Sequence, residues 1–421
     1  MKPRIRTLSI VAAAGGLVAV AIIGTREAPR AAAGTAPPAH AAPAAPAAPA
    51  PTPAPAPVTT ITPVAAPAPP PAPAPIGDHK IQIALLLDTS SSMDGLIDQA
   101  KSQLWKVVNE FAHAQKDGKR ARLEIALYEY GNDGLSARNG WIRRIQPLTT
   151  DLDRVSEALF ALRTNGGEEY AGQVIRTAVQ QLEWSASPDD LKLVFIAGNE
   201  PFDQGPVTPA KAIALATGKG IRVNVIHCGG DDPTWSAGAA LAKGSYMTID
   251  QDRTVAHIAA PQDDEIARLG VELNNTYLAY GLHGKEGLER QSAQDGNAKA
   301  AAQGALVQRS MSKASRSSYR NSTWDLVDAY EDKEVDLDKL AEADLPEEMK
   351  KMTPAERKAH VEARLAERGR IHKRIAELGL ERDKFVDAER AKPGDAAAST
   401  LDTALIGVVH KEGSNAGWRF E

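Results

Sequence analysis

The sequence predicts an α/β fold, in which a doubly wound, mostly parallel sheet is followed by a C-terminal helical extension. From residue 78 to about residue 250, strand-like runs alternate with helix-like runs, an order typical of parallel strands joined by right-handed crossovers. The strand-like runs are continuously apolar, which suits strands covered on both faces. From Pro261 onward the pattern is helical, so we expect helices to follow the sheet.

Composition limits the classes of function that are open to the chain. Its 421 residues include 49 basic and 54 acidic side chains, which gives a net charge of −5. This balance provides no overall field that would attract nucleic acid, so we expect no nucleic-acid partner. Cys228 is the only cysteine, which excludes an intramolecular disulfide and a cysteine metal cluster.

The N-terminal part differs in composition from the rest. Residues 1–27 combine a basic start with the uncharged run 8–24, the pattern of a signal peptide or a signal anchor. The length of this run suits either a cleaved signal or a short spanning helix, so both stay open. Residues 28–76, rich in Pro and Ala, predict a disordered linker. We expect an exported protein, periplasmic or anchored to the inner membrane facing the periplasm, with only this segment at the membrane.

Residues 77–282 are predicted to form the sheet domain. Its strands are expected at 81–88, 123–130, 141–145, 191–197, 221–227 and 246–249. Its helices are expected at 94–114, 151–162, 170–184, 209–217 and 233–242. A further helix over 263–280 has acidic residues in its first turn and an apolar stripe along one face. We expect this helix to pack against the sheet as the last helix of the domain.

The C-terminal extension is predicted to contain three segments. Residues 283–350 form a helical or irregular connector that packs on the sheet domain. Its apolar cluster 324–330 is expected to dock there as well. Residues 351–392 form a long charged helix that begins with a capping box and is bent or folded into a hairpin at its glycines. Its apolar seam fits either a coiled coil with a partner or packing on the chain itself. Residues 393–421 form a tail, whose aromatic end is either docked or a recognition element.

Three oxygen-bearing side chains follow the first predicted strand. Asp88 ends the apolar run, and Ser90 and Ser92 come next at alternate positions. Ligands of open α/β sheets bind beyond such strand ends, and carboxylate and hydroxyl oxygens are ligands that Mg²⁺ and Ca²⁺ prefer. The alternative is a strand-to-helix turn in which Asp88 or a serine caps the following helix.

The stretch from Asp88 to Ser92 resembles the Asp-x-Ser-x-Ser motif of the von Willebrand factor A (vWA) domain, and the order of elements over about 80–250 resembles that domain too. The resemblance is to exported bacterial members with a divergent metal-ion-dependent adhesion site. It implies a divalent cation, usually Mg²⁺, at the carboxyl edge of the sheet, held by Asp88, Ser90 and Ser92. In this family an acidic group from a protein partner often completes the coordination.

The other two ligand loops depart from the family pattern. Where a Gly-Gly-Thr-x-Thr loop is usual, this chain places Glu168 and Glu169 after two glycines. Where Thr-Asp-Gly is usual, Gly198 takes the aspartate position and Asn199 follows it. Our hypothesis is that Glu168 or Glu169, and Asn199 or Glu200, restore the missing oxygens for Mg²⁺, Mn²⁺ or Ca²⁺.

The resemblance implies an exported interaction module that binds a protein partner through the cation, by an acidic side chain of that partner. No catalytic residue and no organic cofactor are expected, because the sequence has no phosphate-binding loop, no serine elbow and no zinc-binding His pair. Two alternatives stay open: a metal-free structural or assembly protein of the cell envelope that acts through its helices, and a metal-assisted hydrolase.

Overall fold

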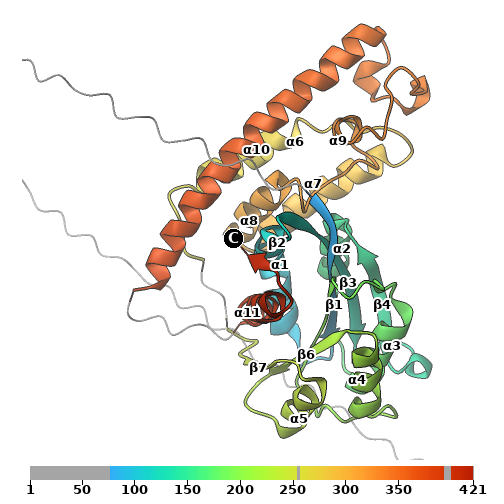
Figure 1. Ribbon diagram of the computed structural model, residues 1–421, viewed down its shortest axis with the longest axis vertical. Helices are drawn as coiled ribbons and strands as arrows, with labels where there is room; N and C mark the ends of the chain where they lie inside the picture. The colour runs from blue at the N-terminus through green and yellow to red at the C-terminus, as the bar shows by residue number, and fades with distance from the viewer. Residues whose placement is uncertain (1–75, 254–256, 393–399, 421) are drawn as a thin grey trace, which may run out of the picture. The chain divides into compact units, whose positions relative to one another are not determined.

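The computed structural model describes residues 76–253, 257–392 and 400–420 (Figure 1). The predicted signal segment, 1–27, and the predicted linker up to residue 75 lie outside the described residues. Among the helices that are described, none is both long and apolar enough to cross a membrane.

A mixed, mostly parallel sheet forms the centre of the fold, as predicted. Its strand order is β7-β6-β5-β1-β3-β2-β8, and β4 also pairs with β3. The parallel strands are β1 (Ile76–Asp88), β3 (Lys119–Tyr130), β5 (Leu191–Gly198), β6 (Arg222–Cys228) and β7 (Tyr246–Ile249). The antiparallel additions are β2 (Ala114–Lys116), β4 (Ile142–Thr149) and β8 (Arg419–Phe420).

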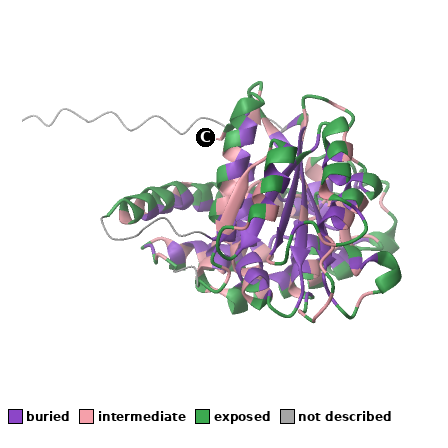
Figure 2. Cartoon of the chain, turned by 90° about the horizontal axis from the view of Figure 1, so that it is seen from below, coloured by how far each residue is buried: buried purple, intermediate pink, exposed green. Residues whose placement is uncertain are grey.

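Helices cover both faces of this sheet, because both faces of its central strands are apolar (Figure 2). In β1, Ile83 and Leu87 join the core on one face while Ala84 and Leu86 join the core on the other, as the alternation of side chains along a strand requires. The first face is covered by α1 (Asp94–Ala112), α2 (Leu152–Phe160) and α11 (Leu401–Asn415), and the second by α3 (Ala171–Gln181), α4 (Pro209–Gly218) and α5 (Pro233–Ala242).

The end of the chain returns to the sheet. Helix α11 lies beside α1 (red and blue in Figure 1), and β8 pairs with β2 at the sheet edge. Trp418 is only 2% exposed and belongs to the same core as α1, so the aromatic end of the chain is docked. We call residues 76–253 and 400–420 the sheet domain and residues 257–392 the helical insertion.

The side chain of Gln99 forms hydrogen bonds at both points where the chain passes between these two parts. The Gln99 amide on α1 donates hydrogen bonds to the carbonyls of Asp250, Gln251 and Arg253, at 2.7, 2.9 and 3.1 Å, where the chain leaves the sheet domain. Its carbonyl oxygen accepts a hydrogen bond from the backbone N–H of Leu401, at 2.9 Å, where the chain returns. Gln99 is 4% exposed, so these bonds form away from water.

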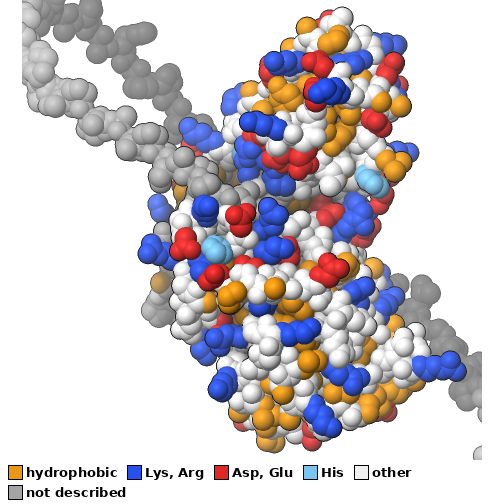
Figure 3. Space-filling model, turned by 45° about the vertical axis from the view of Figure 1, so that its right-hand side comes forward, with side chains coloured by type: hydrophobic (Ala, Val, Ile, Leu, Met, Phe, Trp, Pro, Cys, Tyr) orange, Lys and Arg blue, Asp and Glu red, His pale blue; other side chains and the backbone are white. Residues whose placement is uncertain are grey.

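The helical insertion has its own apolar cores. Its helices are α6 (Asp263–Asn274), α7 (Gly284–Ala301), α8 (Gln303–Ala314), α9 (Leu326–Glu331) and α10 (Pro354–Arg390). Short 3-10 turns lie at Ala137–Asn139 in the sheet domain and at Glu342–Asp344 and Glu347–Met349 in the insertion. Lys and Arg side chains are interspersed with Asp and Glu side chains over the face drawn in Figure 3.

Two packing predictions for this region are wrong. The apolar stripe of α6, with Ile266 and Leu269, packs on α8 and α10 in a core separate from the sheet, because these helices offer it a matching apolar face. Trp324 joins the same core, and Leu326 of α9 packs against Met349, so the cluster 324–330 docks within the insertion instead of on the sheet domain.

Helix α10 begins at the predicted capping box, in which the side chains and backbone of Thr353 and Glu356 bond reciprocally. It continues without interruption through both glycines, so the predicted bend or hairpin does not occur. Its buried residues Ile371, Ile375 and Leu378 pack with α6 and α8. Of the two interpretations of its apolar seam, packing on the chain itself is the one observed.

Candidate functional site

The candidate site lies at the carboxyl ends of β1, β3 and β5. Asp88, the last residue of β1, is opposite Tyr130, the last residue of β3. It is fully buried, and its Oδ1 accepts a hydrogen bond of 2.8 Å from the backbone N–H of Ser90. This bond turns the chain out of the sheet. Met93 occupies the N-cap position of α1, so the capping role considered for Asp88 is not the one it has.

The second carboxylate oxygen of Asp88 is buried without any hydrogen-bond partner among the described residues. Removal from water disfavours the charged carboxylate, so burial raises the pKa of Asp88 to about 7, and the nearby charge of Glu169 adds to this effect. A buried polar atom without a partner is uncommon in folded proteins and calls for an explanation. An unmatched carboxylate oxygen at a sheet edge is a ready ligand for a cation.

The two predicted serines and Asn199 converge beside Asp88. The Oγ atoms of Ser90 and Ser92 are 3.4 Å apart, and the side-chain amide of Asn199 donates a hydrogen bond of 3.0 Å to Ser92 Oγ. The amide oxygen of Asn199 is buried and, within the part of the chain that the structure describes, has no partner. The Ser90 side chain and the Asn199 backbone also bond Asp88, so these residues form one connected group at the end of β1.

Of the two predicted glutamates, Glu169 comes close to Asp88. A Cβ at Gly131 would lie 2.7 Å from Asp88 Oδ1 and 2.8 Å from Glu169 Cγ, so the bare backbone at this position lets the two side chains approach. Glu169 is half-buried and Glu168 is exposed. Burial raises the pKa of Glu169 to about 7, with a further contribution from the charges of Glu200 and Glu168, while a hydrogen bond with the Ser90 side chain lowers it.

Tyr130 explains why glycine replaces the aspartate usual at position 198. A Cβ at Gly198 would overlap the Tyr130 hydroxyl and would lie 3.0 Å from Asp88 Oδ2. This hydroxyl donates a hydrogen bond of 3.0 Å to the carbonyl of Ala197, which fixes it in that space. Sequence analysis missed Tyr130, although its place at the end of the strand next to β1 was the available signal.

The site loops are tied to one another by backbone and side-chain bonds. Asn132 donates a hydrogen bond of 2.9 Å from its amide to the carbonyl of Arg163, and the backbone N–H of Asn165 donates one of 2.9 Å to the carbonyl of Thr89. The Thr164 hydroxyl bonds the carboxylate of Asp94 at the start of α1. The loop that carries Glu169 is thereby fixed against the loop that carries the serines.

The residues present fit a hard divalent cation. Asp88 and Asn199 each have an unmatched oxygen, and Ser90, Ser92 and Glu169 offer further oxygens, which together are the ligand types of Mg²⁺ and Ca²⁺. No group of three or more His, Cys, Asp or Glu side chains that could hold a metal ion occurs within 76–253, 257–392 or 400–420. The candidate set therefore depends on hydroxyl and amide oxygens in addition to carboxylates.

Residues 82–254 match the family model of the von Willebrand factor type A domain. Solved structures similar to part of the chain include proximal thread matrix protein 1 from the mussel byssus with a zinc-occupied MIDAS motif, at 16% identity and a TM-score of 0.34, covering 42% of this chain and 43% of that one. Another is a von Willebrand factor type A protein from Catenulispora acidiphila, at 17% identity and a TM-score of 0.31, covering 41% and 39%.

A third is the pilus adhesin SpaC from Lactobacillus rhamnosus GG, at 12% identity and a TM-score of 0.32, covering 42% of this chain and 28% of the adhesin. The chain thus spans less than half the length of each of these three proteins. No curated protein matches it.

Proposed function

Residues 82–254 form a von Willebrand factor type A domain, and from this premise we propose that the protein is an exported interaction module that binds a protein partner through a divalent cation. Domains of this type are in general interaction modules. The observation that carries the proposal is the buried Asp88 oxygen without a partner among the described residues, because a cation supplies the interaction that this oxygen lacks.

We assign the cation to Asp88, Ser90, Ser92, Glu169 and Asn199. Mg²⁺ is the ion we propose, with Mn²⁺ or Ca²⁺ as substitutes, because the ligands are all oxygens. A bound cation would supply the positive charge that an acidic side chain of the partner binds. Glu168 and Glu200 stay outside the ligand set as exposed charged neighbours, and they favour a cation at the edge of the site.

The residues of the chain hold and orient this site. Ser90 N–H fixes one oxygen of Asp88, which leaves the other oxygen available for the cation. Asn199 fixes Ser92 through its amide nitrogen and keeps its amide oxygen available. The ties made by Asn132 and Thr164 hold the Glu169 loop in place. Export is proposed from the basic and apolar N-terminal segment alone. We assign no catalytic residue.

Calorimetric titration of the full chain with MgCl₂ and MnCl₂ tests the site. We expect saturable binding that Asp88→Asn abolishes, because this variant keeps the shape of the side chain and removes its charge. Asp264→Asn, at an exposed acid in α6, is the matched control and retains binding. Absence of binding at millimolar metal in the unchanged protein contradicts the proposal.

Recovery of partners from envelope extracts, with and without EDTA, tests the role of the cation in recognition. We expect the partner to be lost in EDTA and with Asp88→Asn. Recovery of the same partner in all arms contradicts the cation bridge and favours a metal-free assembly protein that acts through its helical insertion.

A further inference from the structure

A second candidate site lies in the helical insertion, away from the sheet edge. A cavity of about 200 Å³ opens between the segment that follows α8, helix α9 and helix α10. This space is large enough for several waters or for one small polyatomic ion. Arg316, Arg320, Arg368 and His372 line it together with the carboxylates of Asp328 and Glu331.

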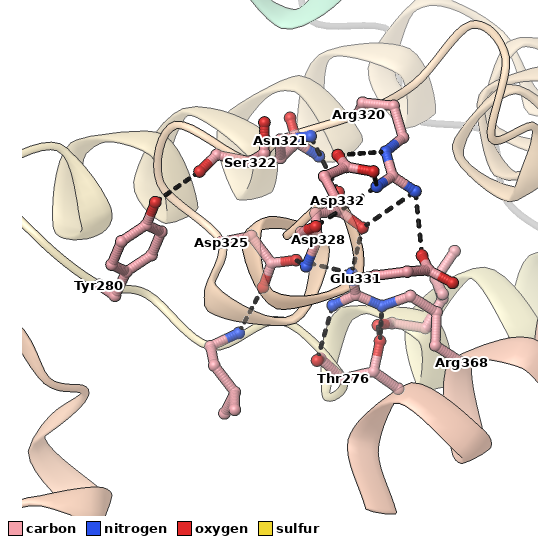
Figure 4. Close-up of polar contacts among 12 residues, drawn as sticks. Thr276, Tyr280, Arg320, Asn321, Ser322, Asp325, Asp328, Glu331, Asp332 and Arg368 are labelled. Carbon is pink, nitrogen blue, oxygen red and sulfur yellow. Dashed lines mark hydrogen bonds and ion pairs between the residues drawn. The ribbon is translucent and has the colours of Figure 1, made fainter. Parts of the chain in front are cut away.

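The lining carboxylates are already neutralised by ion pairs. Asp328 accepts a hydrogen bond of 2.7 Å from Arg368, and Glu331 accepts one of 3.0 Å from Arg320 and is also paired with Arg316. Figure 4 shows Arg320 and Arg368 reaching the acidic side chains of α9 from opposite sides. The same ion pairs engage Arg320 and Arg368, so the half-exposed Arg316 is the lining guanidinium that can also reach a ligand.

His372, on α10, also lines the cavity. Its Nε2 is buried and has no hydrogen-bond partner among the residues described, although it lies one helical turn after Arg368 on α10. Burial, and the charges of Arg368, Arg316 and Arg320, lower the pKa of His372 to about 3. A neutral imidazole among guanidinium groups can donate one N–H, and the positive surroundings favour an anion as the acceptor.

We propose that this cavity binds a small oxyanion, either phosphate or a carboxylate, which accepts hydrogen bonds from His372 Nε2 and from the guanidinium of Arg316. Arg316 suits this role because its side chain is about half exposed and can turn toward a ligand, whereas Arg368 is buried in its own ion pairs. Guanidinium groups are well matched to carboxylate and phosphate oxygens. The proposal does not depend on the cation site at the sheet edge.

The test is calorimetric titration of the full chain with sodium phosphate and, separately, with sodium succinate at the same ionic strength. Binding of phosphate alone indicates a phosphate site, and binding of succinate indicates a carboxylate site. In the arm that binds, we expect the ring proton signals of His372 to shift in NMR spectra, while those of His360, which is paired with Glu348 on the outside of α10, stay in place.

Arg316→Gln should weaken the binding about tenfold, the usual effect of losing a charge-assisted hydrogen bond. Arg374→Gln removes an exposed guanidinium that pairs with Glu265 and should leave the affinity unchanged. Asp88→Asn should also leave it unchanged, which separates this site from the cation site. No saturable binding in either arm, or equal affinity in the Arg316 and Arg374 variants, overturns the proposal and assigns the cavity to water.

Discussion

The sheet edge and the helical insertion both bury charged side chains, but they satisfy them differently. Asp88 is fully buried, and one of its oxygens has no partner in the described chain. Arg368, 2% exposed, has a partner at each of its three nitrogens: Nη1 donates to Asp325 and Asp328 at 2.6 and 2.7 Å, and Thr276 accepts from Nε at its hydroxyl and from Nη2 at its carbonyl, at 3.0 and 2.7 Å. Figure 4 shows this saturated cluster.

The difference separates a structural cluster from a ligand site. A buried charge whose hydrogen bonds are all made within the chain fixes the elements that contribute to it. A buried charge that lacks a partner carries a cost that an external ligand can remove. Burial by itself therefore does not identify a functional residue. An unmatched buried oxygen points to a ligand site where other oxygen ligands lie beside it, as they do at Asp88.

A second saturated cluster joins the insertion to the sheet domain. Arg309 on α8 is fully buried and donates a hydrogen bond of 2.6 Å to Asp153 on α2, whose other oxygen accepts one of 2.6 Å from the Tyr319 hydroxyl. Lys313, also on α8, bonds Asp295 on α7 at 2.9 Å. The two contacts of Asp153 attach the insertion to the helix that precedes the Glu169 loop, and the Lys313 bond ties α8 to α7 within the insertion.

The largest effect that we expect comes from breaking the saturated cluster. Arg368→Ala leaves the carboxylates of Asp325 and Asp328 buried without their cation, and removal of one partner of a buried pair costs about 3–5 kcal/mol in the free energy of unfolding. Chemical denaturation of the full chain measures this loss. Arg374→Ala, in an exposed pair on the same helix, should cost at most about 1 kcal/mol. Equal losses in the two variants would contradict the distinction between the clusters.

At the sheet edge, the corresponding test is the pH dependence of stability without divalent cations. The pKa of Asp88 is about 7 in the folded chain, above its ordinary value of 3.8, so the folded state holds this proton more tightly than the unfolded state. This contribution to stability is present at low pH and is lost as the pH rises from about 4 to about 7, by on the order of 3 kcal/mol. Denaturation in EDTA at pH 5 and pH 8 measures it.

Asp88→Asn is the control, because a neutral amide has no proton to lose. The difference in unfolding free energy between pH 5 and pH 8 should shrink in this variant, and MgCl₂ should shrink it in the unchanged protein by stabilising the ionised carboxylate. The same pH dependence in both proteins would show that the unmatched oxygen of Asp88 carries no such cost.

Local sequence patterns predicted most of the sheet domain, but they did not predict that the end of the chain returns to it. Continuous apolar runs and the helices between them indicate a parallel sheet, and the strands over 191–198 and 246–249 were predicted to within a residue. Leu401, Leu405 and Val408 recur at helical spacing, which can indicate α11. No local pattern says that α11 returns to α1 across the helical insertion, because that contact depends on packing between distant segments.

The candidate site likewise contains some residues that the sequence predicts and others that only the structure identifies. Asp88, Ser90 and Ser92 are recognisable because a motif and a strand end coincide. The choice between Glu168 and Glu169 needs the path of the loop, since neighbouring residues of an extended loop lie in different surroundings. The effect of Tyr130 on position 198 needs the register between strands, which the sequence of one strand does not contain.

The smallest effect that we expect is the coupling between Gly198 and Tyr130. It tests whether Tyr130 is the reason that the sheet edge lacks the aspartate usual in this family. Gly198→Ala places a methyl group against the Tyr130 hydroxyl and should lower the free energy of unfolding by about 1–3 kcal/mol. Tyr130→Phe alone loses one hydrogen bond to Ala197 and should cost about 1 kcal/mol. In the double variant the methyl group takes the space of the absent hydroxyl, so the combined loss should be smaller than the sum by about 1 kcal/mol.

Denaturant unfolding of the four proteins measures this coupling. Gly218→Ala is the matched control, because a Cβ at Gly218 meets nothing within 4 Å, and its effect should add to that of Tyr130→Phe without coupling. Additive losses for the Gly198 and Tyr130 variants would mean that the hydroxyl does not exclude a side chain at position 198. A combined loss smaller than the sum would instead explain the missing aspartate by Tyr130, since the volume that an aspartate needs is the volume that this hydroxyl occupies.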